Sequence, residues 1–197
     1  MKATKEREKD MEKKFTTKEV VVVAMVAAVI GVIYTLLDWA YMPLSAVLGT
    51  VFMELTFGVY MLSAAMPMYL VRKPGFAIFG ALVTAGVNLL LGSPYGLQLV
   101  LAGFLEGLAV EIAYAVVDRY QGSMKNLVLS GILGPIFVLC RDTFFWGTPW
   151  SYGTAVAAGV VIVRFFSAIV LTTIIVKVIT AALAKTGVLK GFKCVQK

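Results

Sequence analysis

The sequence predicts an all-α integral membrane protein, a bundle of six transmembrane helices with both the N- and the C-terminus in the cytosol. The 197 residues are 60% hydrophobic and 15% charged, and their mean hydropathy is +0.89. This hydrophobic content exceeds what the core of a water-soluble domain requires. Six apolar runs alternate with short turns, and Lys and Arg concentrate in alternate turns and at the two ends of the chain.

The first three apolar runs, and so the first three expected helices, cover residues 20–37, 49–71 and 76–91. A charged segment, residues 1–19, precedes the first run. That run leads into an aromatic loop at 38–48 and not into a small-residue cleavage site, which predicts a retained helix and not a signal peptide. The charged turn from Arg72 to Gly75 ends the second run, and the Gly- and Pro-containing turn 92–96 ends the third.

The last three helices are expected at 97–117, 127–146 and 154–184. Each crossing needs roughly 20 apolar residues, so six crossings use nearly the whole chain. The expected organisation is a single membrane domain at 20–184, flanked by the N-terminal segment and a basic tail at 185–197.

Charge in the turns predicts the orientation. The connections 38–48, 92–96 and 147–153 contain no Lys or Arg, whereas 72–75, 118–126 and both termini do. Because cytosolic loops are enriched in Lys and Arg, both termini are expected in the cytosol. The protein is therefore expected to be a multi-pass protein of the inner, cytoplasmic membrane, with the lipid bilayer as its surroundings.

The uncharged connections are rich in aromatic residues, which indicates either an interfacial aromatic belt or a binding mouth. Their concentration on one side favours the mouth. The leading candidates to stack on a ligand are Trp39, Tyr95 and Trp146, with Tyr60 and Trp150 in reserve.

Polar residues inside the apolar runs are costly and usually face a cavity or a partner. Four of them fall beneath the aromatic connections and are the candidate substrate-binding residues: Glu54, Asn88, Glu106 and Asp142. We expect Glu54 and Asp142 to face the ligand and the other two to supply hydrogen bonds.

Structural ion pairs are expected elsewhere in the bundle. Arg164 is expected to pair with Glu106 or Glu111, and Arg141 with a neighbouring acid. The ionisable residues in the outer and middle parts of the apolar runs are four acids and two bases, namely Glu54, Glu106, Glu111 and Asp142 against Arg141 and Arg164. An unpaired buried carboxylate takes up a proton or attracts a cation, so the count predicts a cationic or hydrogen-bonding ligand.

Several functional classes fit poorly. The chain contains no histidine, which excludes Ser-His and Cys-His pairs and His-based metal sites. It also lacks the G-x-x-x-x-G-K-[ST] loop of P-loop ATPases. No catalytic residue, metal site or cofactor is therefore expected. The net charge of +7 is attributed to membrane topology and not to nucleic-acid binding.

Several segments together resemble the YkoE family of substrate-binding S components of energy-coupling factor (ECF) transporters. They are FMELTFG around Glu54, VRKPG at 71–75, LLGSPYG at 90–96, EGLAVE at 106–111, Arg141-Asp142, Val163-Arg164 and TGVLKG at 186–191. The resemblance covers about residues 20–192.

The resemblance implies a six-helix subunit that binds thiamine or its hydroxymethylpyrimidine precursor from outside. It also implies two partners, a transmembrane coupling (T) subunit and a pair of ABC-type ATPases. Ala24 and Ala28 match the A-x-x-x-A arrangement of helix 1 associated with docking on the coupling subunit, and loop 38–48 resembles the lid over the pocket. Where that family carries an acid this chain has Asn88, and where it carries an amide this chain has Glu106.

Two other classes stay open. A self-sufficient small-solute carrier or channel would normally show an internal repeat or a continuous polar path, and neither is evident in the sequence. A scaffold or assembly factor would bind no small molecule saturably.

Overall fold

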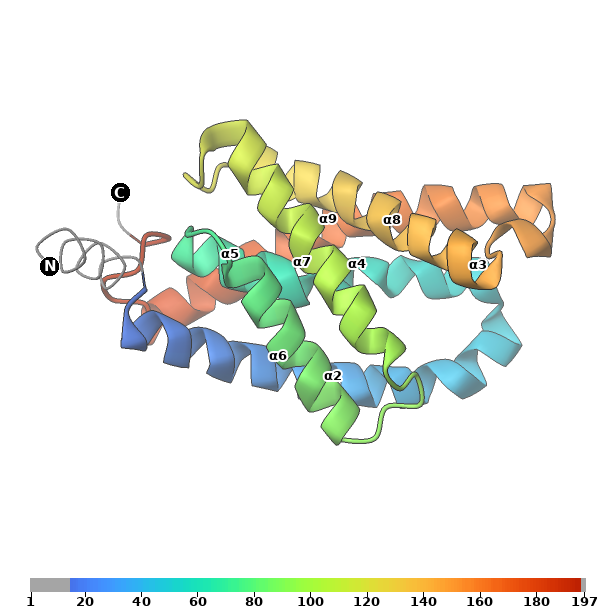
Figure 1. Cartoon of the computed structure of the whole chain (residues 1–197), viewed down its shortest axis with the longest axis horizontal. Coiled ribbons are helices and arrows are strands. Elements are labelled where there is room, and N and C mark those ends of the chain that lie inside the picture. Colours follow the sequence, from blue (N-terminus) through green and yellow to red (C-terminus); the bar gives the residue numbers. More distant parts are fainter. Residues whose placement is uncertain (1–14, 196–197) are drawn as a thin grey trace, which may run out of the picture.

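The structure, a computed structural model, describes residues 15–195 as a helical bundle (Figure 1). Residues 1–14 and 196–197, which belong to the expected N-terminal segment and basic tail, lie outside the described residues. The elements are α2 (Thr17–Leu48), α3 (Thr50–Met53), η1 (Glu54–Thr56), α4 (Phe57–Tyr60), α5 (Leu62–Val71), α6 (Phe76–Leu90), α7 (Gln98–Asp118), α8 (Met124–Trp146), η2 (Trp150–Tyr152) and α9 (Thr154–Lys185).

Six helical segments are apolar enough to belong in a bilayer. In the described part of the chain, five spans are long enough to cross it, namely α2, the combined span Thr50–Val71, α7, α8 and α9. The sixth, α6, is apolar but has only 15 residues, which makes it about 22 Å long. The prediction of an all-helical, multi-pass membrane protein is confirmed.

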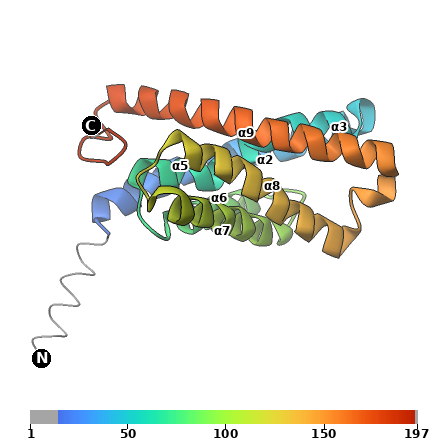
Figure 2. The same ribbon diagram turned by 90° about the horizontal axis from the view of Figure 1, so that it is seen from above.

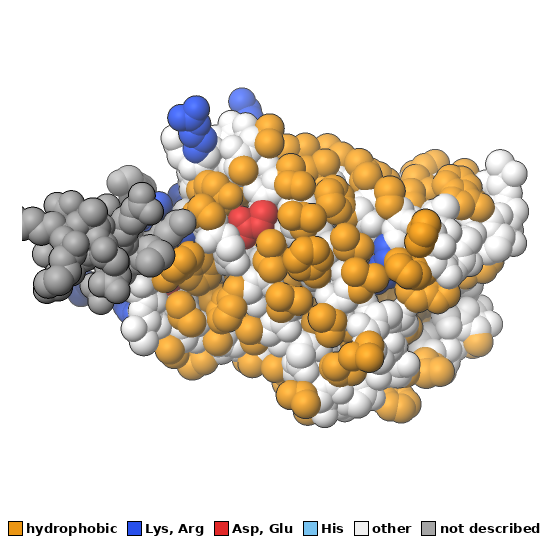
Figure 3. All heavy atoms as spheres, in the orientation of Figure 1, with side chains coloured by type: hydrophobic (Ala, Val, Ile, Leu, Met, Phe, Trp, Pro, Cys, Tyr) orange, Lys and Arg blue, Asp and Glu red, His pale blue; other side chains and the backbone are white. Residues whose placement is uncertain are grey.

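The bundle has two distinct ends. The beginning of α2, the end of α9 and the charged turns after α5 and α7 lie together at what we call the terminal end (Figure 1). The connections that follow α2, α6 and α8 lie toward the opposite, far end. Helix α9 runs along one side of the bundle, with α6 and α7 on the opposite side (Figure 2). The face in Figure 3 is mostly hydrophobic, as expected for a surface in contact with lipid.

The prediction of a loop at 38–48 is wrong, because α2 continues through this segment to Leu48. Its aromatic residues and Pro43 suggested a loop. A proline removes one backbone donor and can be accommodated when the rest of the helix is held in place. Here Tyr41 donates a hydrogen bond to the Met53 carbonyl at 2.8 Å, which fixes the helix end against the following span. The segment that was expected as a lid is the last part of a helix.

The expected continuous helix at 49–71 is broken between Met53 and Leu62. A break inside a membrane frees backbone groups that must find other partners, because lipid offers none. Hydroxyl groups of neighbouring helices serve here: Tyr41 donates to Met53 O (2.8 Å), Ser167 to Leu55 O (2.6 Å), Thr172 to Gly58 O (2.9 Å) and Tyr34 to Val59 O (2.8 Å). The break is therefore specified by α2 and α9.

Helices approach most closely at glycines. A Cβ added at Gly107 of α7 would lie 2.7 Å from the Cα of Ile78 on α6, and one at Gly131 of α8 would lie 2.7 Å from the Cα of Ile169 on α9. The central helix α5 has nine of its ten residues buried. At Gly107 and Gly131 the missing side chain therefore lets neighbouring helices pack closely.

The last described residues fold back onto the terminal end. Leu189 and Phe192 are buried in one apolar cluster with Val22, Val71 and Phe76. The Lys18 ammonium group donates a hydrogen bond to the carbonyl of Lys190 at 2.7 Å. This part of the tail is thus a packed element of the bundle.

Candidate ligand-binding cavity

A cavity of about 460 Å³ lies between the helices toward the far end of the bundle. Its size is within the range of small-molecule sites. It is lined by Asp38, Tyr41, Met53, Glu54, Phe57, Tyr60, Tyr95, Gln98, Leu99, Ala102, Glu106, Val138, Arg141, Asp142, Trp146, Thr148, Tyr152 and Arg164. The broken span contributes Glu54 from η1 and Tyr60 from α4, so the irregular backbone faces the cavity, as membrane-buried irregular backbone usually does.

The structure brings six of the nine sequence-predicted ligand-binding residues to this cavity: Glu54, Tyr60, Tyr95, Glu106, Asp142 and Trp146. Asn88 lines a smaller adjoining chamber of about 40 Å³. Trp39 and Trp150 do not line the cavity, and their side chains are 56% and 54% exposed. That any of these residues binds a ligand stays a prediction.

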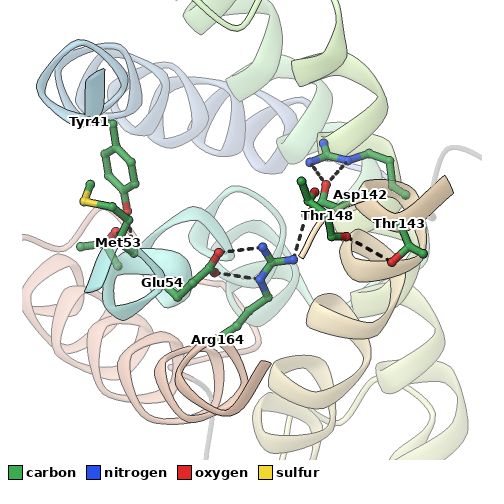
Figure 4. A network of polar contacts seen from close by, with 9 residues as sticks. Tyr41, Met53, Glu54, Asp142, Thr143, Thr148 and Arg164 are labelled. Carbon is green, nitrogen blue, oxygen red and sulfur yellow. Dashed lines mark hydrogen bonds and ion pairs between the residues drawn. The ribbon is translucent and has the colours of Figure 1, made fainter. Parts of the chain in front are cut away.

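Arg164 joins two sides of the cavity (Figure 4). Its Nε and Nη2 donate to the two carboxylate oxygens of Glu54 at 2.8 and 2.7 Å, and its Nη1 donates to Asp142 Oδ2 at 2.8 Å. The expected pairing of Arg164 with Glu106 or Glu111 is therefore wrong. Position along the sequence did not indicate this contact between Glu54 on the broken span and Arg164 on α9.

Arg141 completes this cluster. Its Nε and Nη2 donate to Asp142 Oδ1 at 3.0 and 2.6 Å, so the expected pairing with a neighbouring acid is confirmed. The guanidinium group also lies over the Trp146 ring, 5.3 Å from its centroid. Two guanidinium groups thus meet the carboxylates of Glu54 and Asp142, which makes this side of the cavity electrically neutral.

Glu111 lies away from the cavity and contacts the start of α6. Its Oε1 accepts a hydrogen bond from the Ala77 amide at 3.0 Å, and its Oε2 accepts one from the Tyr120 hydroxyl at 3.3 Å. A carboxylate next to a helix N-terminus satisfies free amides and the helix dipole. Glu111 therefore stabilises the fold at the terminal end.

Asp38 is a cavity residue that the sequence reasoning missed. It is fully buried and accepts hydrogen bonds from the Tyr60 hydroxyl (2.7 Å), the Asn88 amide (2.8 Å) and the Ser93 hydroxyl (2.7 Å). Burial and the Asp38 carboxylate together raise the pKa of Tyr95 in the adjacent connection, so its phenol stays a neutral donor. The missed signal was an acid at the end of a long apolar run, which was assigned to a loop.

Glu106 lies between the cavity and the adjoining chamber and lines both. Its Oε2 accepts a hydrogen bond from the Ser63 hydroxyl at 2.9 Å, and the residue is 6% exposed. The chamber is large enough for a water molecule. Glu106 is thus a buried carboxyl group with one direct side-chain donor.

A membrane-spanning helical bundle with a charged cavity between its helices is the architecture of a membrane transport protein. Residues 18–137 match the family described as "ABC-type cobalt transport system, permease component". This match covers more than half of the chain, which therefore belongs to that family.

Two further comparisons agree. A protein of Bacillus subtilis (strain 168) named as an HMP/thiamine permease, YkoE, is 27% identical over 179 residues, covering 91% of this chain and 89% of that protein. A crystal structure of an S component of an ECF transporter superposes with a TM-score of 0.84 and 26% identity, covering 90% of this chain and 89% of the other. The S-component fold and the resemblance to the YkoE family are confirmed.

Proposed function

We propose that this protein is the substrate-binding S subunit of an ECF-type importer that captures thiamine or hydroxymethylpyrimidine from outside the cell. The observation that carries the proposal is the cavity of about 460 Å³ within an S-component fold. The name of the Bacillus relative supports this ligand class.

The chemistry of the cavity suits an aminopyrimidine. Tyr60, Tyr95 and Trp146 offer aromatic surface for a flat ring. Glu54, Glu106 and Asp142 supply carboxyl groups in the cavity, and Asn88 supplies an amide behind it. A carboxylate accepts hydrogen bonds from an amino group, and a protonated carboxyl group donates to a ring nitrogen. A metal cargo fits less well, because within residues 15–195 no group of three or more Asp, Glu, Cys or His side chains is arranged to hold a metal ion.

The subunit is proposed to deliver its ligand with a transmembrane coupling subunit and a pair of ABC-type ATPases in the cytoplasmic membrane. Ala24 and Ala28 are half-buried on α2 beside an exposed apolar face that includes Met25 and Val29. A surface of this kind suits close packing with another helix. ATP hydrolysis then belongs to the partner subunits.

The direct experiment is to purify the protein in detergent and identify copurifying small molecules by mass spectrometry. Binding of thiamine and hydroxymethylpyrimidine is then measured by calorimetry. We expect saturable binding without ATP, and accumulation in proteoliposomes only when the coupling module and ATP are present. Multiple-turnover counterflow by the protein alone would contradict the proposal and favour a self-sufficient carrier.

The proposed orientation places both termini in the cytosol and the cavity toward the outside. It is supported by the charged turns at the terminal end. The test uses exposed Ser151 and Lys125, each replaced by Cys after both native cysteines are changed to Ser. A membrane-impermeant maleimide added to intact cells should label Ser151→Cys and spare Lys125→Cys. The reverse pattern would overturn the orientation.

A further inference from the structure

The cavity has two sides that differ in charge. Four carboxyl groups and two guanidinium groups line it: Asp38, Glu54, Glu106, Asp142, Arg141 and Arg164. Both guanidinium groups are engaged by Glu54 and Asp142. The two carboxyl groups in excess are therefore Asp38 and Glu106, on the side formed by α2 and α7.

No cation of the described residues forms an ion pair on that side. None of the ion pairs within residues 15–195 includes Asp38 or Glu106. Their hydrogen-bond partners are neutral hydroxyl and amide groups. A buried carboxylate that lacks a cation either takes up a proton or awaits a positively charged ligand.

The two excess groups differ in what they still offer a ligand. Asp38 is fully enclosed, and its two oxygens already accept three hydrogen bonds. Glu106 accepts one hydrogen bond, from Ser63, on Oε2. Its other oxygen, Oε1, accepts no hydrogen bond from a side chain within residues 15–195, and the residue lines the cavity. Glu106 is thus the acid with a free oxygen available to a ligand.

We propose that Glu106 is the specificity-determining residue that selects a cationic ligand, and that Asp38 adds negative charge beside it. This inference rests on the function proposed above. The ligand's positive group lies on the α2 and α7 side. Glu54 and Asp142 are both bound to Arg164 (Figure 4). These two acids stabilise the opposite wall of the cavity and do not select the ligand by its charge.

The first test compares thiamine, which carries a cationic thiazolium, with hydroxymethylpyrimidine, which is neutral. Glu106→Gln keeps an acceptor for Ser63 and removes only the charge. It should weaken thiamine binding about tenfold or more, as expected for a lost charged contact, and change hydroxymethylpyrimidine binding much less. The matched control is Glu111→Gln, a glutamate outside the cavity, which should change the binding of neither ligand. Unchanged thiamine binding in Glu106→Gln, or an equal loss of both ligands, would overturn the assignment.

The second test needs no vitamin. Replacing Trp39 and Trp150 by Phe leaves Trp146 as the single tryptophan, in the cavity wall. Quenching of its fluorescence is measured with cationic N-methylpyridinium and with neutral acrylamide. Glu106→Gln should lower the cation's quenching constant and leave that of acrylamide unchanged. The control Glu111→Gln, outside the cavity, should change neither.

The two tests separate two kinds of failure. If the parent protein binds neither vitamin, the proposed ligand is wrong, and the quenching experiment still decides the role of Glu106. If the quenching by N-methylpyridinium is the same in Glu106→Gln and in its parent, Glu106 does not attract cations and the inference fails.

Discussion

The two ends of the bundle are built in opposite ways. At the terminal end, helices pack through an apolar cluster that includes Val22, Val71 and Phe192. At the far end, one span is broken, and charged groups surround a cavity. The contrast indicates that apolar packing holds the bundle together at one end while polar contacts shape a cavity at the other. Substitutions at the two ends should therefore separate stability from binding.

The largest effect is expected at Arg164, because its ion pairs should contribute to both stability and ligand binding. Arg164→Gln leaves Glu54 without a cation, and removing one partner of a buried ion pair typically costs about 3 to 5 kcal/mol. We expect a strongly lowered unfolding temperature in detergent and loss of ligand binding. Arg164→Lys keeps the charge but loses the two-pronged contact with Glu54, so it should recover part of the stability. Parent-like unfolding of Arg164→Gln would contradict the structural role of the ion pairs.

The next largest effect is expected where α6 and α7 pack. Gly107→Ala places a Cβ against the Ile78 backbone, and such overpacking costs about 1 to 3 kcal/mol. Gly86→Ala is the matched control, because a Cβ there meets nothing within 4 Å and alanine favours the helix by about 1 kcal/mol. Thermal unfolding should show opposite shifts. Parent-like unfolding of Gly107→Ala would contradict the close contact between α6 and α7.

A third prediction concerns the lipid-facing surface of α2. Ala28→Trp should abolish uptake by the complete transporter and leave ligand binding close to that of the parent, because a bulky ring separates two closely packed helices. Val178→Trp is the control, on an exposed site of α9 toward the same end, and should leave uptake intact. Equal loss of uptake and binding in Ala28→Trp would place this contact inside the subunit.

The smallest expected effect lies at the cavity wall. Trp146→Ala should weaken binding by about 0.5 to 1.5 kcal/mol beyond the loss of buried area, the contribution of one aromatic contact. Trp39→Ala should have little effect, since its side chain lies outside the cavity. Calorimetric titration of both variants tests this. If Trp146→Ala binds as tightly as the parent, Trp146 does not stack on the ligand.

Much of the fold was predictable because a bilayer allows few solutions. Apolar runs of the right length must be helical there, and the bounds of α6 to α9 agree with the predicted runs to within a few residues. The break in Thr50–Val71 was not predictable in the same way. It depends on hydroxyls of Tyr41, Ser167 and Thr172, which come from other helices and leave no local mark on the broken segment.

The residues of the cavity were easier to predict than their partners. Counting polar residues within apolar runs indicated Glu54, Glu106 and Asp142, all of which line it. The pairing of Arg164 could not be derived, because it depends on how the break in Thr50–Val71 places Glu54 against α9. Asp38 was missed for the same reason that the end of α2 was, since an aromatic, proline-containing segment was interpreted as a loop.

The short helix α6 has a consequence for the surrounding lipid. At 15 residues it is about 22 Å long, whereas α2, against which it packs, has 32 residues and is about 48 Å long. Typical hydrocarbon is about 30 Å thick, and a span this short is accommodated by local thinning of the bilayer, by flanking residues that reach the interface, or by contact with another protein. Lipids with shorter chains match this side of the protein better than longer ones do.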